Sequence, residues 1–448
     1  MPDVVQPAHA YPPDLARLVR ERWTESDGSE RSAAAPVDVT SGLPSSPVLE
    51  RLLSVCYQAS LLHEEGRPVT FRISFAGPEE FALLGSPPAG LHRLLFEQAR
   101  PFDEYELRRL APAAVFERSL IGVRLEQGGA LGVWGLIHSG PRWLQAVRGG
   151  RRIRQAIPRV LMVAVTGPGR VLVSKGQRTL AGIAGGTLAN VATDVFSAPW
   201  FASVFGERQA AQRAEHASRP GRPTPHGSLE RGLGQKLGEH VLRRVVATIR
   251  AARHGGTLVI LPPDARKLCN DDRCLALKYP FFDEEPRRRI LTLTVQIMDE
   301  LGQESLPGTA QPVARGGWTA YEASADSSLT ALDEALFEVA HLVATLANVD
   351  GAVVITDELE ILGFGAEISG SLPEVGVVER CLDVDGVRRV AERTDRVGTR
   401  HRSAYRLCQA VHDALVIVVS QDGGVRFVCW RDGGVVYFDQ IATGPWEV

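Results

Sequence analysis

The chain has 448 residues, of which 44% are hydrophobic and 23% charged, and its formal net charge is −3. This length allows two or three domains. The near-neutral charge argues against general nucleic-acid binding. The absence of a long apolar run argues against a membrane span. The start of the chain also lacks the basic and apolar segments of a secretory signal, so we expect a cytoplasmic protein with no membrane partner and no nucleic-acid partner.

The first part of the chain indicates a leader followed by a domain. Residues 1–46 are rich in Pro, Ser and Ala, which indicates a mostly flexible leader with a short helical stretch from Leu15 to Trp23. Residues 47–205 show a mixed α/β pattern. We expect a helix over 48–57, strands over 68–73, 119–125, 130–138, 159–165 and 170–174, and a glycine turn over 182–186. Strands 119–125 and 130–138 flank a Gly-Gly turn and should form a hairpin.

No motif in this first domain names a ligand. Its glycine turn lacks the Lys-Ser/Thr of a phosphate-binding loop and does not satisfy a dinucleotide fingerprint. Trp134 and Trp143 either line a pocket or pack in a core. A basic patch either binds an acidic ligand or is a solvated charge run; it consists of Arg148, Arg151, Arg152 and Arg154. The N-terminal region is therefore expected to bind an unknown ligand or protein.

The second part of the chain predicts a larger α/β domain. Residues 206–228 are polar and proline-containing, as in a linker, and the domain should span 229–448. The expected helices cover 229–253, 289–301, 335–346 and 402–411, and the expected strands cover 257–261, 352–356, 414–420, 425–430 and 435–439. Residues 304–328 look loop-like within a long insertion, 262–333. This pattern predicts a mixed sheet covered by helices.

One short stretch concentrates cationic and hydroxyl groups. Gly398-Thr399-Arg400-His401-Arg402-Ser403 precedes and opens the last expected helix. A hydroxyl just before a helix caps it, the exposed N–H groups attract anions, and arginine adds forked donors that match phosphate oxygens. The like charge of the flanking arginines disfavours protonated His401, which suggests a donor role. The stretch predicts a polyphosphate site, although such clusters are more often solvated faces.

A carboxylate upstream supplies the other half of a nucleotide site. Asp350 and Gly351 stand between an apolar helical pattern and the strand that begins at Ala352. Taken alone, Asp350 reads as a turn residue. Mg²⁺, however, typically uses one or two protein carboxylates and takes its other ligands from phosphates and water. Paired with the basic stretch, Asp350 therefore indicates a nucleotide–metal site.

The order of these motifs resembles the diadenylate cyclase domain family, the DisA-type enzymes that make cyclic di-AMP. The resemblance covers roughly residues 230–445, nearly half of the chain. It runs through the segments 254–260, Asp350-Gly351-Ala352, Leu362-Gly363-Phe364-Gly365-Ala366, Gly398 to Ser403, and Ala414 to Gln421. It implies a C-terminal mixed-sheet α/β cyclase-like domain preceded by a separate α/β domain that acts as a sensor.

The resemblance also implies a reaction and roles for single residues. Two ATP molecules would condense into cyclic di-AMP with release of two pyrophosphates, with Mg²⁺ or Mn²⁺ as cofactor, in a face-to-face homodimer. Asp350 would ligate the metal and help to activate the ribose hydroxyl. The remaining roles are triphosphate binding for Thr399, Arg400, His401, Arg402 and Ser403, phosphate contact for Ser420, and close backbone approach for Gly351, Ala352 and Gly365.

Some positions depart from the family pattern. Val349 stands where some members have a histidine before the Asp-Gly-Ala motif, and Gln421 stands where some have an acidic residue. A non-catalytic nucleotide-binding sensor that keeps the pocket is the alternative to an enzyme, and a structural or interaction protein is a third reading. Asp350 and the complete Arg400-His401-Arg402 series are both present, and this favours the enzyme over the non-catalytic alternatives.

Overall fold

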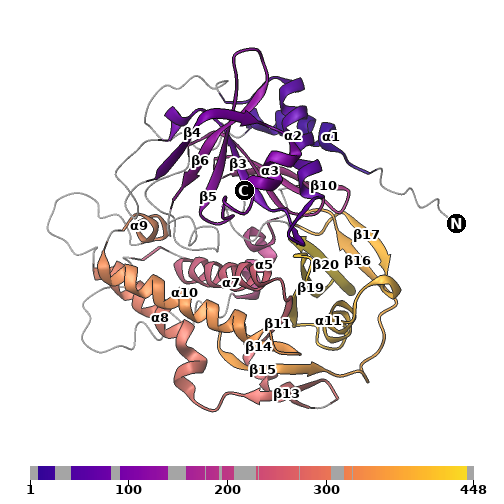
Figure 1. Ribbon diagram of the computed structural model, residues 1–448. Coiled ribbons are helices and arrows are strands. Elements are labelled where there is room, and N and C mark those ends of the chain that lie inside the picture. The colour runs from indigo at the N-terminus through magenta and orange to yellow at the C-terminus, as the bar shows by residue number, and fades with distance from the viewer. Residues whose placement is uncertain are drawn as a thin grey trace. The chain divides into compact units, whose positions relative to one another are not determined.

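The computed structural model describes residues 9–25, 42–81, 91–139, 158–176, 178–190, 194–205, 229–230, 232–271, 273–303, 317–324 and 326–440. Two compact units divide the chain (Figure 1). The first consists of Met1–Val147, Ile153–Val191 and Pro445–Val448, and the second of Arg148–Arg152 and Ala192–Gly444. The expected linker 206–228, the basic patch at 148–154 and Trp143 lie outside the described residues.

The first unit contains an eight-stranded sheet in the order β10-β9-β8-β7-β3-β5-β6-β4 and a small two-stranded sheet, β1-β2. In the large sheet β3 and β5 are parallel and the other neighbours antiparallel. The strands of the first unit are β1 (His63–Glu64), β2 (Arg67–Pro68), β3 (Phe71–Phe75), β4 (His92–Pro101), β5 (Ser119–Leu125), β6 (Leu131–His138), β7 (Leu161–Gly167), β8 (Arg170–Lys175), β9 (Arg178–Ala184) and β10 (Thr187–Asn190). Its helices are α1 (Pro12–Glu25), α2 (Ser46–Ser60), the short 3₁₀ turn η1 (Pro78–Glu80) and α3 (Glu104–Leu110).

Helices α1 and α2 share one hydrophobic core with this sheet. Leu15, Val19 and Trp23 are buried there because their spacing places them on one face of α1. The prediction of a flexible leader is therefore wrong for residues 12–25. The hairpin β5–β6 forms as expected, and Trp134 is a core residue whose Nε1 donates a hydrogen bond to the Ala76 carbonyl at 2.7 Å.

The second unit contains a ten-stranded mixed sheet in the order β12-β13-β15-β14-β11-β18-β19-β20-β16-β17. Its strands are β11 (Gly256–Leu261), β12 (Asn270–Asp271), β13 (Leu275–Pro280), β14 (Ala352–Thr356), β15 (Ile361–Ile368), β16 (Val377–Cys381), β17 (Arg389–Arg393), β18 (Leu415–Val419), β19 (Val425–Arg431) and β20 (Gly434–Gln440). Its helices are η2 (Val195–Ser197), α5 (Pro199–Val204), α7 (Leu233–Ala252), η4 (Pro263–Cys269), α8 (Glu284–Gln303), α9 (Trp318–Ala323), α10 (Ser327–Leu346), η5 (Thr394–Arg396) and α11 (Thr399–Ala410).

Helices cover both faces of this second sheet. Leu258 and Val353 point into a core shared with α7, α8 and α10, whereas the alternate residues Val259 and Val354 point into a second core shared with α11. Figure 1 shows α7, α8 and α10 together on one side of β11 and β14, with α11 on the other. The α/β fold class is thus confirmed, and α11 covers this second face together with residues of η4.

Two expectations about the second unit need correction. Residues 194–205 were assigned to the first domain, but Phe196 and Phe201 are fully buried in the second core. Part of the loop-like stretch 304–328 is helical, because α9 covers Trp318–Ala323 and α10 begins at Ser327. Helix α9 has only six residues, too few to show a helical period, and the first turn of α10 is mostly Ser and Thr, so only its later part, 335–346, was visible as an apolar pattern.

Candidate functional site

Asp350 occupies the short connection between the end of α10 and the start of β14. Its side chain is exposed and makes no hydrogen bond or ion pair with any other described residue. β14 runs parallel to β11, with Leu258 opposite Val353. Asp350 and Gly255 therefore precede the first residues of two neighbouring parallel strands, at the same end of the sheet.

The basic stretch forms the first turns of α11. The helix begins at Thr399, with Gly398 as an extended N-cap residue, and no side chain caps this end. The expectation that the helix starts at Arg402 and that Thr399 caps it is therefore wrong. The apolar periodicity begins only at Ala404, so the polar first turn left no trace in the pattern. The His401 backbone N–H donates to the Gly398 carbonyl at 3.1 Å, so the N–H groups of Thr399 and Arg400 are those of this turn that remain available to an acceptor.

Arg400 connects the start of α11 to the strand end beside Asp350. Its Nη1 lies 3.5 Å from the His254 carbonyl oxygen, and a Cβ atom added to Gly255 would lie 2.7 Å from the same nitrogen. β18 is antiparallel to β11 on its other side, with Val419 opposite Gly256, so Ser420 ends at this edge too. The structure thus brings the carboxylate-bearing loop and the arginine-rich helix start to one edge of one sheet.

The glycines of the two motifs contact each other. A Cβ on Gly351, whose φ is +112°, would lie 2.6 Å from the Gly365 carbonyl carbon. Gly365 has a φ of +66°, and a Cβ there would lie 3.0 Å from the Tyr279 ring. Ala352 is buried in the core beneath α11. The packing of the protein itself therefore demands these small residues, before any approach to a nucleotide is considered.

Ser420 is engaged within its own turn. Its hydroxyl lies in hydrogen-bonding distance of the Asp422 carboxylate and 3.1 Å from the Gly424 carbonyl oxygen. A hydroxyl has one hydrogen to donate, so it serves one of these acceptors at a time. In this structure the side chain shapes the β18–β19 turn, and a phosphate contact would require it to rotate.

His401 has a different environment from the two arginines beside it. The side chain is half-buried, and burial followed by the positive charge of Arg426 lowers its pKa to about 4. Asp439 and Asp422 act in the opposite direction, and Arg400 adds to the lowering. The imidazole is therefore neutral at pH 7 and carries one N–H donor.

A polar network behind His401 was missed from the sequence. Arg426 donates to Asp439 at 2.9 Å and to the Tyr405 hydroxyl at 3.2 Å, and its guanidinium lies 4.3 Å from the centre of the Tyr437 ring. Tyr405 lies one turn after His401, on the same side of α11. Arg380 also pairs with Asp439, at 3.1 Å. The only sequence signal was one arginine, Arg426, in the otherwise apolar stretch 425–430.

The surroundings of Asp350 are suited to a divalent cation that brings ligands of its own. Lys278 is close enough for the charge of Asp350 to raise its pKa, but the larger cause is its hydrogen bond to Glu367, at 2.5 Å. The ammonium is thus bound elsewhere, and the Asp350 carboxylate is left exposed. No cluster of three or more His, Cys, Asp or Glu side chains forms a metal site within the described residues, so a metal held here would depend on phosphates and water.

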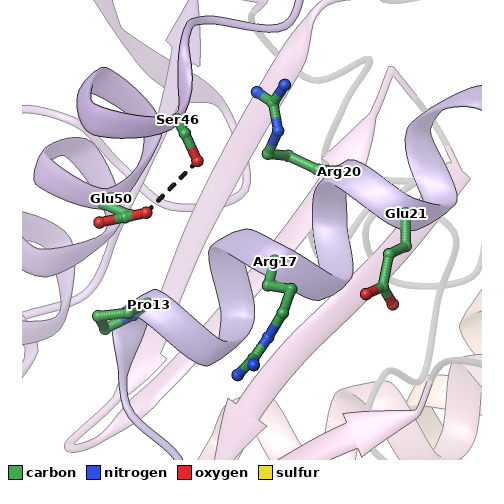
Figure 2. Close-up of a pocket in the computed structure, with 6 residues that line it drawn as sticks. All are labelled: Pro13, Arg17, Arg20, Glu21, Ser46 and Glu50. Carbon is green, nitrogen blue, oxygen red and sulfur yellow. Dashed lines mark hydrogen bonds between the residues drawn. The ribbon is translucent and has the colours of Figure 1, made fainter.

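A shallow depression in the first unit lies between α1 and α2 (Figure 2). Figure 2 shows Arg17 and Arg20 pointing away from each other. Arg17 pairs with Asp14, and Arg20 donates to the Pro44 carbonyl at 3.2 Å. Glu21 and Glu50 also line the depression, so its charges balance and do not select an anion or a cation.

Comparison with known proteins gives one match. Residues 38–138 match a protein family described as "Probable sensor domain DACNV". The matched segment includes α2 and the strands from β1 to β6 of the first unit. No curated protein and no solved structure matches the chain. In the described part of the chain, no helix combines the length and apolarity needed to cross a membrane.

Proposed function

We propose that the second unit is a diadenylate cyclase that condenses two ATP molecules into cyclic di-AMP and releases two pyrophosphates. The observation that carries the proposal is the position of Arg400 against His254 and Gly255, just before β11, whose parallel neighbour β14 begins two residues after Asp350. A carboxylate and a cationic, uncapped helix start beside the same sheet edge form the two halves of a triphosphate site.

In each half-reaction the 3′-oxygen of one ATP forms a bond to the α-phosphorus of the other. The bond from that phosphorus to the bridging β-phosphate oxygen breaks, and pyrophosphate leaves. Asp350 accepts the hydroxyl proton and passes it to water. Arg400, Arg402 and the N–H groups that begin α11 hold the triphosphate, and neutral His401 donates a hydrogen bond to it. Thr399 and Ser403 add hydroxyl donors on the same helix turns.

One carboxylate per active site suits Mg²⁺ or Mn²⁺, and Asp350 would hold the ion. When bound, the ion neutralises charge that develops on the phosphates. Because two nucleotides must face each other, we propose that two second units from different chains meet at this sheet edge. We further propose that the first unit, which contains the match to a sensor domain of diadenylate cyclase-type proteins, controls the rate in response to a ligand or protein.

The test is incubation of the full chain with ATP and Mg²⁺ or Mn²⁺, followed by mass identification of the product. The expected product is cyclic di-AMP, and Asp350→Asn should abolish it. Asp413→Asn, which changes an exposed carboxylate beyond the far end of α11, is the matched control and should keep full activity. Product formation by Asp350→Asn at the parental rate would contradict the role of Asp350.

A binding protein without turnover is the competing outcome. Calorimetry would then detect ATP binding that depends on Arg400, while no pyrophosphate is released from any combination of ATP and metal. This result would leave the geometry of the site intact and remove the cyclase activity from the proposal.

A further inference from the structure

A stacked aromatic pair on β13 and β15 has no assigned role. Tyr279 on β13 is opposite Phe364 on β15, and their rings stack with centroids 4.7 Å apart and planes 22° apart. Phe281 supports Phe364, with ring centroids 6.0 Å apart, and packs against the core beneath α8. Tyr279 remains 51% exposed. Its ring thus has one face supported by protein and much of its surface open to solvent.

A continuous series of contacts connects this ring to the carboxylate. A Cβ on Gly365 would lie 3.0 Å from Tyr279 Cδ2, and a Cβ on Gly351 would lie 2.6 Å from the Gly365 carbonyl carbon. Asp350 directly precedes Gly351. Lys278, the neighbour of Tyr279, is within electrostatic range of Asp350. The backbones of two glycines, Gly365 and Gly351, thus lie between Tyr279 and Asp350.

The order of these groups across the sheet matches the order of groups in a nucleotide. Moving from β13 through β15, β14 and β11 to β18, one meets Tyr279, then Asp350, and then Arg400 beside Gly255. Strands are spaced by about 4.8 Å, so β13 and β11 are roughly 14 Å apart. That distance suits an extended nucleoside triphosphate, with phosphates at the arginine end and a flat apolar group at the other.

We propose that Tyr279, supported by Phe364, binds the purine base of the nucleotide by stacking on its ring. The inference rests on the proposed function, since it assumes that the triphosphate lies at the start of α11. Aromatic side chains and bases stack because both present flat, weakly hydrated faces. Stacking alone does not read base edges, so Tyr279 contributes affinity for adenine and guanine alike.

The experiment compares two ligands by calorimetry in the full chain: ATP, and inorganic tripolyphosphate, which has no base. Tyr279→Leu keeps an apolar contact with Phe364 but removes the ring, and should weaken ATP binding about tenfold, which corresponds to about 1.4 kcal/mol. Tyr279→Phe should bind ATP within about twofold of the parent. Tripolyphosphate affinity should be unchanged in both variants, which also shows that the site is folded. Tyr105→Leu, an equally exposed tyrosine of the first unit at 58%, is the matched control.

Unchanged ATP affinity in Tyr279→Leu would overturn the inference, as would an equal loss of ATP and tripolyphosphate affinity. A loss of self-association in Tyr279→Leu, measured by sedimentation, with unchanged ATP affinity would assign the ring to an interface between two copies and overturn it too. Failure of the cyclase proposal is distinguishable, because a parent protein that forms no cyclic di-AMP can still show the Tyr279-dependent difference between the two ligands.

Discussion

The three central residues of the basic stretch divide by environment. Arg402 is exposed and Arg400 reaches the sheet edge, whereas His401 is half-buried and within electrostatic range of Arg426 and Asp439. A neutral histidine between two permanent cations can donate to phosphate without adding a third positive charge. Charge neutralisation and directional hydrogen bonding are thus assigned to different side chains.

We predict that Arg426→Met raises the pKa of His401 from about 4 toward 6.5, the ordinary value for histidine. The sign follows because the positive charge of Arg426 disfavours the protonated imidazole. Burial is the larger cause and persists, so the rise should be incomplete. The measurement is an NMR titration of the His401 ring, with Arg388→Met, which removes an exposed arginine paired with Asp383, as control. An unchanged midpoint would show that Arg426 does not act on His401.

The depressed pKa of His401 also has a consequence for stability. Because the unfolded histidine binds a proton near pH 6.5 and the folded one only near pH 4, stability should fall as pH drops through this interval. His401→Gln should reduce the slope of unfolding free energy against pH between these values, as measured by urea denaturation. A slope identical to that of the parent would contradict the prediction.

Gly351→Ala should lower the unfolding free energy by at least about 1–2 kcal/mol. The added methyl would clash with the Gly365 backbone at a positive φ. Gly370→Ala is the matched control, since a Cβ there meets nothing within 4 Å. Urea denaturation distinguishes the two, and equal stabilities would show that the contact between the two glycines relaxes without cost.

At the scale of elements, helices α7 and α10 are joined by a buried ion pair. Arg244 is fully buried and donates to the Asp333 carboxylate at 2.6 Å and to its carbonyl at 3.1 Å. The Tyr321 hydroxyl from α9 binds the same carboxylate oxygen. One carboxylate therefore holds three helices together on the face of the sheet opposite α11.

Asp333→Ala should cost about 3–5 kcal/mol, because it leaves the Arg244 charge buried without its counter-ion. The control is Glu338→Ala, an exposed position on the same helix α10, which should change stability by less than about 0.5 kcal/mol. Guanidinium denaturation of both variants is the measurement. A similar small loss in both would mean that water or a neighbouring group replaces Asp333.

The elements that could be predicted from the sequence have strong local signals. β14 was predicted with its observed bounds because four of its five residues are apolar and all five are buried. The first turn of α11 and helix α9 were missed, since their residues are mostly polar or small. Helix α1 was recognised as helical, but its burial depends on contacts with α2 and the sheet, which local periodicity cannot reveal.

The candidate site was predictable in part for the same reason. Asp350 and Arg400 belong to short motifs that are visible along the chain. Tyr279 and Arg426 carry no such motif, and strand pairing alone brings them near the site. The insertion 262–333 hid Tyr279, because it interrupts the order of elements between the motifs.

At the scale of the whole chain, residues 194–205 decide where the second unit begins. Phe196, Phe201 and Phe205 are buried in the second core, and the backbone N–H of Val195 donates to Gln440 at 2.8 Å. Asp194 also pairs with Arg243 of α7. The second unit thus needs a segment that precedes the undescribed stretch 206–228.

A fragment of residues 192–448 should therefore unfold cooperatively, whereas a fragment of 229–448 should be much less stable. Removing several buried aromatic side chains forfeits about 3–5 kcal/mol for each, which exceeds the reserve of a typical domain. Thermal unfolding by circular dichroism compares the two fragments. Equal melting temperatures would show that the aromatic segment contributes little to the core.

The same aromatic segment governs how chimaeras of this protein can be assembled. If the first unit were exchanged for an unrelated domain at a junction inside 206–228, residues 194–205 would be removed with it. The second unit would then expose the apolar core surface that Phe196, Phe201 and Phe205 cover. A junction placed just before Asp194 keeps these three phenylalanines with the second unit. Domains fused in place of the first unit should therefore be joined at that earlier position.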